Sequence, residues 1–175
     1  MAAASLASSG VMAQNYVYGA VGASDIDLGC VGAATCDTKG TAFKLGFGRD
    51  LGGWGFELGY ADFGKAKASD PGITAEAKAQ GVTLAAVWLP QLSENWGLAA
   101  RAGIGYVKTT LSASISGVGS ASDSEWNVAP YLGLGIHYAL TKSAKLELGV
   151  DFTKGEFEDE KADVRAVSLG FRYAF

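Results

Sequence analysis

The feature that most constrains the fold of this chain is a two-residue alternation between bulky apolar side chains and small or charged ones. In residues 43–62, a hairpin turn at Gly52-Gly53 would pair Gly48 with Glu57. Successive side chains of a strand point to opposite faces of a sheet. One face of this hairpin is therefore predicted to hold glycines and charges, whereas the opposite face holds Phe43, Leu45, Phe47, Phe56, Leu58 and Tyr60.

The same alternation recurs along most of the chain, which predicts an all-β protein. Residues 15–24 form a further β-rich segment whose facing the pattern does not assign. Together with the hairpin, these segments amount to about eight strands, the small end of the range for barrels. The five recurring segments are residues 82–88, 96–106, 126–140, 146–152 and 167–175.

The predicted connections alternate between short and long. Short ones fall at Gly52-Gly53, 90–95 and 141–143, and long loops are expected at 25–39, 65–77, 112–124 and 155–162. Short and long connections then lie on opposite rims, with both chain ends on the short rim. This arrangement predicts an eight-stranded antiparallel up-and-down β-barrel.

The four tryptophans indicate that the bulky face meets lipid rather than a core. All four fall on that face close to predicted strand ends, where amphipathic rings sit at the headgroup depth of a membrane. A soluble ligand-carrying barrel would place its largest rings in mid-strand instead. The fold class is therefore a transmembrane β-barrel, with an aromatic girdle of Trp54, Trp88, Trp96, Trp126, Tyr138 and Tyr173.

The opposite face is then the lumen, and its charges are nearly balanced. Ions removed from water must be paired, because burying an isolated ion costs several kcal/mol. Glu147 and Arg172 have similar depths on neighbouring strands and are expected to form one such pair. An eight-stranded interior is just wide enough for side chains to fill, so we expect a closed lumen, with a small porin-like channel as the alternative. The predicted lumen charge network comprises Lys44, Glu57, Arg101, Lys145, Glu147, Asp151 and Arg172.

The first residues of the chain are predicted to form a segment separate from the barrel. Residues 1–13 are small and apolar and suit the end of a truncated signal peptide, so the barrel domain is expected to span residues 14–175. Export would permit a disulfide between Cys30 and Cys36, the two cysteines of the chain. Two thiols cannot close a zinc site without further ligands, so a loop disulfide is favoured over two inert thiols.

No catalytic constellation is evident, and we expect no enzymatic activity, cofactor or metal. His137 is the only histidine and falls on the lumen face near the short rim, where a structural hydrogen-bonding role is favoured over that of a general base. The formal net charge is −4, so the chain lacks the excess of positive charge that is typical of proteins that bind nucleic acid. The acidic segment 155–162 could hold divalent cations, but it lacks EF-hand spacing, and a solvated loop is favoured.

The residues as a whole resemble the OmpA/OmpX-like family of small eight-stranded outer-membrane barrels. The resemblance rests on "FKLGFGRDLGGWGFELGYADF", on the alternating segments and on the terminal "FRYAF", and it covers about residues 15–175. It implies a monomer in the Gram-negative outer membrane, reached through the periplasm, and no peptidoglycan-binding domain is expected. Its implied partners are outer-membrane lipid, lipopolysaccharide, the barrel-assembly machinery and an unknown surface ligand.

The resemblance also implies roles for particular segments. In this family, alternate aromatics that end the final strand are the signal for the assembly machinery, which maps to Phe171, Tyr173 and Phe175. The implied function is non-enzymatic. The protein would serve the integrity of the cell envelope, or surface interaction or adhesion through its long extracellular loops.

Overall fold

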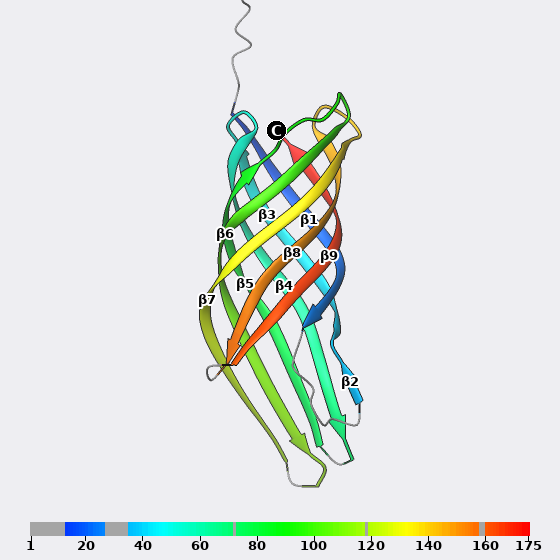
Figure 1. Ribbon diagram of the computed structural model, residues 1–175, viewed down its shortest axis with the longest axis vertical. Helices are drawn as coiled ribbons and strands as arrows, with labels where there is room; N and C mark the ends of the chain where they lie inside the picture. The colour runs from blue at the N-terminus through cyan, green and yellow to red at the C-terminus, as the bar shows by residue number, and fades with distance from the viewer. Residues whose placement is uncertain (1–12, 27–34, 72, 118, 158–159) are drawn as a thin grey trace, which may run out of the picture.

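The protein is a closed antiparallel β-barrel. The computed structural model describes residues 13–26, 35–71, 73–117, 119–157 and 160–175, and Figure 1 shows an elongated barrel of tilted strands. Within these residues, no helix has the length and apolarity needed to cross a membrane. The strands are β1 (Gln14–Ile26), β2 (Thr35–Asp37), β3 (Lys39–Asp50), β4 (Trp54–Asp70), β5 (Ile73–Trp88), β6 (Trp96–Ile115), β7 (Gly119–Ala139), β8 (Ala144–Phe157) and β9 (Glu160–Ala174).

Eight of these strands form the barrel wall, which confirms the predicted fold class. Neighbouring strands pair antiparallel in chain order, and β9 returns to β1, where Tyr173 lies opposite Val17. The short strand β2 pairs with the far end of β4 and acts as an outward continuation of β3. Because β9 returns to β1, each strand of the wall has a neighbour on both sides over at least part of its described length, as a lipid environment requires.

The predicted hairpin between β3 and β4 is also confirmed. Gly48 lies opposite Glu57, as the alternation requires. Gly52 and Gly53 have φ angles of 102° and 87°, a region that L side chains rarely adopt. The carboxylate of Asp50 accepts hydrogen bonds of 2.8 Å from both glycine N–H groups. This turn therefore sets the register of the two strands.

The two faces of the wall have the orientation of a membrane protein. Leu58 is 54% exposed on the outside, whereas its neighbour Glu57 is 3% exposed in the lumen. Large apolar side chains line the outside of all eight strands of the wall, and the buried carboxylate, lysine and arginine side chains come from β3, β4, β6, β8 and β9. A soluble protein would not expose an apolar surface of this extent.

The long loops expected at 65–77, 112–124 and 155–162 are instead continuations of the strands. β4 and β5 are separated by residues 71–72, β6 and β7 by 116–118, and β8 and β9 by 158–159. The prediction was wrong because it relied on the alternation of apolar and polar side chains. That alternation arises only where the two faces of a strand meet different surroundings. Beyond the membrane the outer face of a ribbon meets water instead of lipid, so the apolar alternation fades while the ladder hydrogen bonds continue. In the connection expected at 25–39, residues 27–34 lie outside the described residues.

Candidate functional site

The centre of the lumen is an ionic layer built around Arg101. Its Nε lies 2.5 Å from Oε2 of Glu57, and its Nη1 lies 2.7 Å from Oε1 of Glu147. Nη2 of Arg172 lies 2.6 Å from Oε2 of Glu147 and 3.6 Å from Oε1 of Glu57. Two guanidinium groups thus face two carboxylates, and all four side chains are buried. The layer is neutral, so it avoids an uncompensated charge at membrane depth.

A second buried pair joins Lys44 and Asp151. The Nζ of Lys44 lies 2.6 Å from Oδ2 of Asp151, and the hydroxyl of Tyr131 donates a 2.5 Å hydrogen bond to Oδ1. Lys145 is half-buried, and within the described residues it has no ion-pair partner. The structure therefore brings six of the seven predicted lumen charges together and leaves Lys145 apart.

Tyrosines complete the polar lumen, and the sequence reasoning did not include them in the site. The hydroxyl of Tyr16 donates a 2.8 Å hydrogen bond to Glu57, and the guanidinium of Arg172 lies 4.6 Å from the ring of Tyr16. A side-chain carbon at Gly48 would collide with this ring. The glycine-rich lumen face therefore provides space for tyrosine rings. The β1 pattern did not assign a facing, so the inward position of Tyr16 could not be predicted from it.

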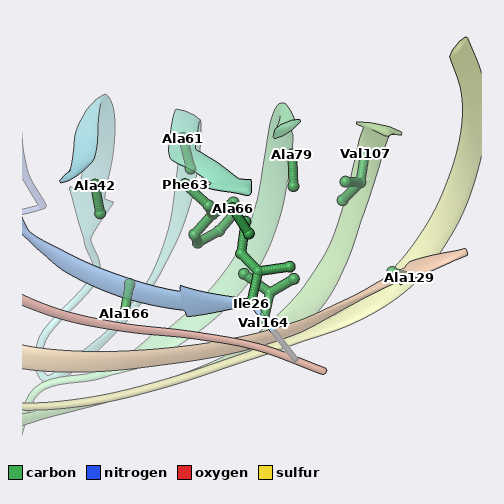
Figure 2. Packing of buried hydrophobic residues seen from close by; sticks show 10 residues of the cluster. All are labelled: Ile26, Ala42, Ala61, Phe63, Ala66, Ala79, Val107, Ala129, Val164 and Ala166. Atoms are coloured by element: carbon green, nitrogen blue, oxygen red, sulfur yellow. The ribbon is translucent and has the colours of Figure 1, made fainter. Parts of the chain in front are cut away.

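Apolar clusters lie on both sides of the ionic layer. Towards the long rim, Ile26, Phe63 and Val164 project into the lumen among smaller side chains from the surrounding strands (Figure 2). Towards the short rim, Val87 and Leu89 are buried with Tyr16, Ala99 and Ala174. Two cavities beside the charged residues have volumes of about 10 Å³ each, room for about one water molecule. The lumen is therefore filled in successive layers.

Aromatic side chains surround the outside of the barrel near both rims. At the short rim the rings of Trp96 and Tyr138 lie 4.9 Å apart, and those of Trp54 and Trp88 lie 6.0 Å apart. At the long rim the rings of Tyr106 and Trp126 stack 4.8 Å apart. Trp96 and Tyr106 are ten residues apart on β6, a spacing that matches the 9–11 residues of a membrane-spanning strand. Tyr173 is also exposed, close to the short rim.

This inverted barrel agrees with a comparison against protein families. A model described as "Outer membrane protein beta-barrel domain" matches residues 1–175. The chain belongs to this family. It is therefore an outer-membrane barrel of the Gram-negative type. Barrels of this type have short periplasmic turns, and their longer hairpins face the outside of the cell. A comparison with curated proteins gives no match.

Solved outer-membrane barrels share the fold at low sequence identity. Ail of Yersinia pestis, solved with the heparin analogue sucrose octasulfate, is 16% identical with a TM-score of 0.62, covering 93% of this chain and 99% of Ail. Neisserial surface protein A is 16% identical with a TM-score of 0.62, covering 94% and 99%. The N-terminal barrel of Pseudomonas aeruginosa OprF is 14% identical with a TM-score of 0.54, covering 94% and 100%. At these identities the likeness concerns the fold alone.

The structure bears differently on the predictions made for the histidine, the cysteines and two segments of the chain. His137 is 1% exposed in the lumen, but within the described residues neither ring nitrogen has a hydrogen-bond partner, so the expected hydrogen-bonding role is not seen. Cys36 belongs to β2, whereas Cys30 lies outside the described residues, so the disulfide stays a prediction. Residues 1–12 of the predicted signal-peptide segment 1–13 and residues 158–159 of the acidic segment also lie outside them, so the signal peptide stays a prediction.

The final aromatics lie at the closure of the barrel. Phe171 and Tyr173 point outward on β9, and the N–H of Phe175 donates a 2.9 Å hydrogen bond to the carbonyl of Asn15. The last residue is thus paired with the first strand. This position is compatible with the proposed role of Phe171, Tyr173 and Phe175 as an assembly signal.

Deleting Phe175 is expected to reduce insertion into the outer membrane severalfold while changing refolding in detergent little. The deletion removes the terminal aromatic and one backbone hydrogen bond, which contributes only about 1 kcal/mol. Insertion would be measured by membrane fractionation and by heat-modifiable migration on gels. The matched control, Phe175→Tyr, should insert normally. Normal insertion of the deleted chain would contradict the assembly role.

Proposed function

We propose that this outer-membrane barrel is a non-enzymatic surface protein whose extended hairpins contact structures outside the cell. The observation that carries the proposal is the length of the β6–β7 hairpin. Beyond the long-rim girdle at Trp126, its ladder continues from Thr109↔Glu125 to Ile115↔Gly119. At about 3.4 Å per residue, this ribbon rises roughly 20 Å above the girdle.

The composition of this ribbon supports contact rather than lipid anchoring. Its far end carries exposed serine and alanine side chains, including Ser114, Ser120 and Ala121. In this ribbon β6 pairs with both β5 and β7 as far as Ile115, whereas β7 pairs with β6, so the ribbon is stiffer than a loop of the same composition. The names of two structural neighbours, the attachment invasion locus protein and a surface protein, are in keeping with a surface role.

The packed lumen favours this function over a porin-like channel. A conducting pore needs a continuous polar path, whereas Phe63 and Leu89 belong to apolar clusters on either side of the ionic layer. In planar bilayers the purified protein is expected to show no stable, ion-selective conductance. Stable conductance would support the channel in place of the closed barrel.

The surface role can be separated from a general role in envelope integrity by shortening one hairpin. Three strains would be compared: one without the chain, one with the full chain, and one whose chain lacks residues 110–123, which removes the far end of the β6–β7 ribbon. The shortened chain is expected to restore survival in bile salts but not attachment to a cultured epithelial layer. Attachment equal to that of the full chain would contradict contact through this hairpin.

A further inference from the structure

The wall of the barrel opens between β7 and β8 towards the long rim. The ladder between these strands ends at Leu132↔Phe152. Both strands continue further, β7 back to Gly119 and β8 on to Phe157. On its other side, β7 remains paired with β6 as far as Gly119. Along this stretch, β7 therefore lacks a ladder partner only on its β8 side within the described residues.

Pro130 provides the physical reason for this seam between β7 and β8. Its carbonyl accepts a 3.0 Å hydrogen bond from the hydroxyl of Thr153, so the polar edge of this residue faces β8. Proline has no N–H to donate to a ladder and is confined to the edges of sheets. The hydroxyl of Thr153 thus satisfies the carbonyl of Pro130, the one backbone hydrogen-bonding group of a proline. The regular pairing of β7 with β8 stops two residues away, at Leu132.

The seam forms a groove of about 220 Å³ with two chemical parts. Pro130, Leu132 and Phe152 provide an apolar lining, whereas the charged and exposed lining residues are two cations, Lys154 and Arg165, and one carboxylate, Asp163. A pocket that encloses a whole small molecule usually has roughly 300–1,000 Å³. The groove is smaller and lies on the lipid-facing side of the wall, so it suits part of a chain from the surrounding membrane.

The two cations are available to a ligand. Arg165 lies opposite Phe152 and Lys154 lies opposite Asp163 in the β8–β9 ladder, so the cations are diagonal neighbours on the outer face. Within the part of the chain that the structure describes, neither cation has an ion-pair partner. The cations of the neighbouring β4–β5 ribbon differ, since Lys65 lies 2.5 Å from Glu76 and Lys78 lies 2.9 Å from Asp62.

The depth of the groove matches the outer boundary of the membrane. Trp126 belongs to the long-rim girdle, and Lys108 lies 5.8 Å from its ring. Pro130 is four residues from Trp126 along β7, on the membrane side of the girdle. An acyl chain at this depth would have its phosphorylated headgroup near the girdle, within reach of long cationic side chains that extend towards the interface.

We infer that this groove binds a phosphorylated lipid of the outer leaflet, the lipid A part of lipopolysaccharide. One acyl chain lies against Pro130, Leu132 and Phe152, and a phosphate is held between Lys154 and Arg165. The lipid fills the seam that Pro130 leaves in the wall. This site does not depend on attachment through the hairpins, so either proposal can fail without the other.

The charged part is tested by titrating the full chain, refolded in detergent, with purified lipid A under native mass spectrometry. The double variant K154Q/R165Q is expected to bind about tenfold more weakly, because each basic residue near an anionic lipid surface contributes severalfold. The control K65Q/K67Q removes two cations that already face Glu76 and should bind as the wild type does. Equal affinities of wild type and K154Q/R165Q would overturn the inference, as would an equal loss in the control.

Two further variants test the sign of the charge effect and the apolar lining. Asp163→Asn removes the carboxylate opposite Lys154 and should tighten binding severalfold. Leu132→Ala should weaken binding, whereas Leu134→Ala, which is also exposed on β7 but lies outside the groove, should not. Heat-modifiable migration verifies that each variant is folded. If lipid A without phosphates, or inorganic phosphate alone, bound as tightly as lipid A, the assigned ligand would be wrong.

Discussion

Replacing Arg101 by methionine is expected to lower the free energy of unfolding by about 3–5 kcal/mol, because it leaves buried carboxylates without their partner. Arg101 contacts both Glu57 and Glu147 within 2.7 Å, and all three side chains are buried. Arg172 remains, but one guanidinium cannot compensate two carboxylates. The measurement is equilibrium unfolding by urea in lipid vesicles, followed by heat-modifiable migration.

The matched control for this prediction is an exposed ion pair. Lys65 also lies 2.5 Å from a carboxylate, but its side chain is 52% exposed. Lys65→Met should therefore cost less than about 1 kcal/mol. Adding Glu57→Gln to Arg101→Met should recover part of the loss, since it removes one of the uncompensated charges. A loss below about 1 kcal/mol for Arg101→Met would contradict a tightly coupled ionic layer.

Replacing Phe63 by alanine is expected to lower the free energy of unfolding by about 3–5 kcal/mol, the usual range for a large buried ring. Phe63 is 3% exposed and belongs to the apolar cluster that fills the long-rim half of the lumen. The surrounding strands are held by barrel closure and cannot collapse into the space that the ring leaves. The same unfolding assay measures the loss.

Phe56 provides the comparison for Phe63, since both lie on β4 but on opposite faces. Phe56 is 60% exposed on the lipid side. Lipid chains can fill the space left by Phe56→Ala, so the loss there should be clearly smaller than for Phe63→Ala. Equal losses at the two positions would show that the lumen is not packed as a core.

Much of the fold could be predicted from sequence, because the alternation of a strand is a local property of the backbone. The inward position of Glu57 and the outward position of Leu58 follow from the two-residue period. The register of β3 and β4 follows from the turn at Gly52-Gly53. The contact between Glu147 and Arg172 could be anticipated because their strands are neighbours, and the two side chains lie 2.6 Å apart.

The extent of the strands outside the membrane could not be predicted in the same way. Thr109 to Ile115 form a regular ladder with β7, yet their larger apolar side chains, Leu111 and Ile115, do not fall on the lipid-facing side of β6. The signal was missing because the outer face of this ribbon meets water instead of lipid. The seam between β7 and β8 could not be predicted either. The sequence shows that β7 contains Pro130, but not which of the two neighbouring strands the backbone of Pro130 faces.

What the sequence determined by itself is which side chains point inward, which point to lipid, and where β3 and β4 turn. Only the tertiary structure decided that Arg101 on β6 meets Glu57 on β4 and Glu147 on β8, and that the ring of Tyr16 lies over Gly48. The contacts of Arg101 join strands that are not neighbours in the sheet. They depend on the closure, tilt and stagger of the whole barrel, and a period of two residues carries no information about those quantities.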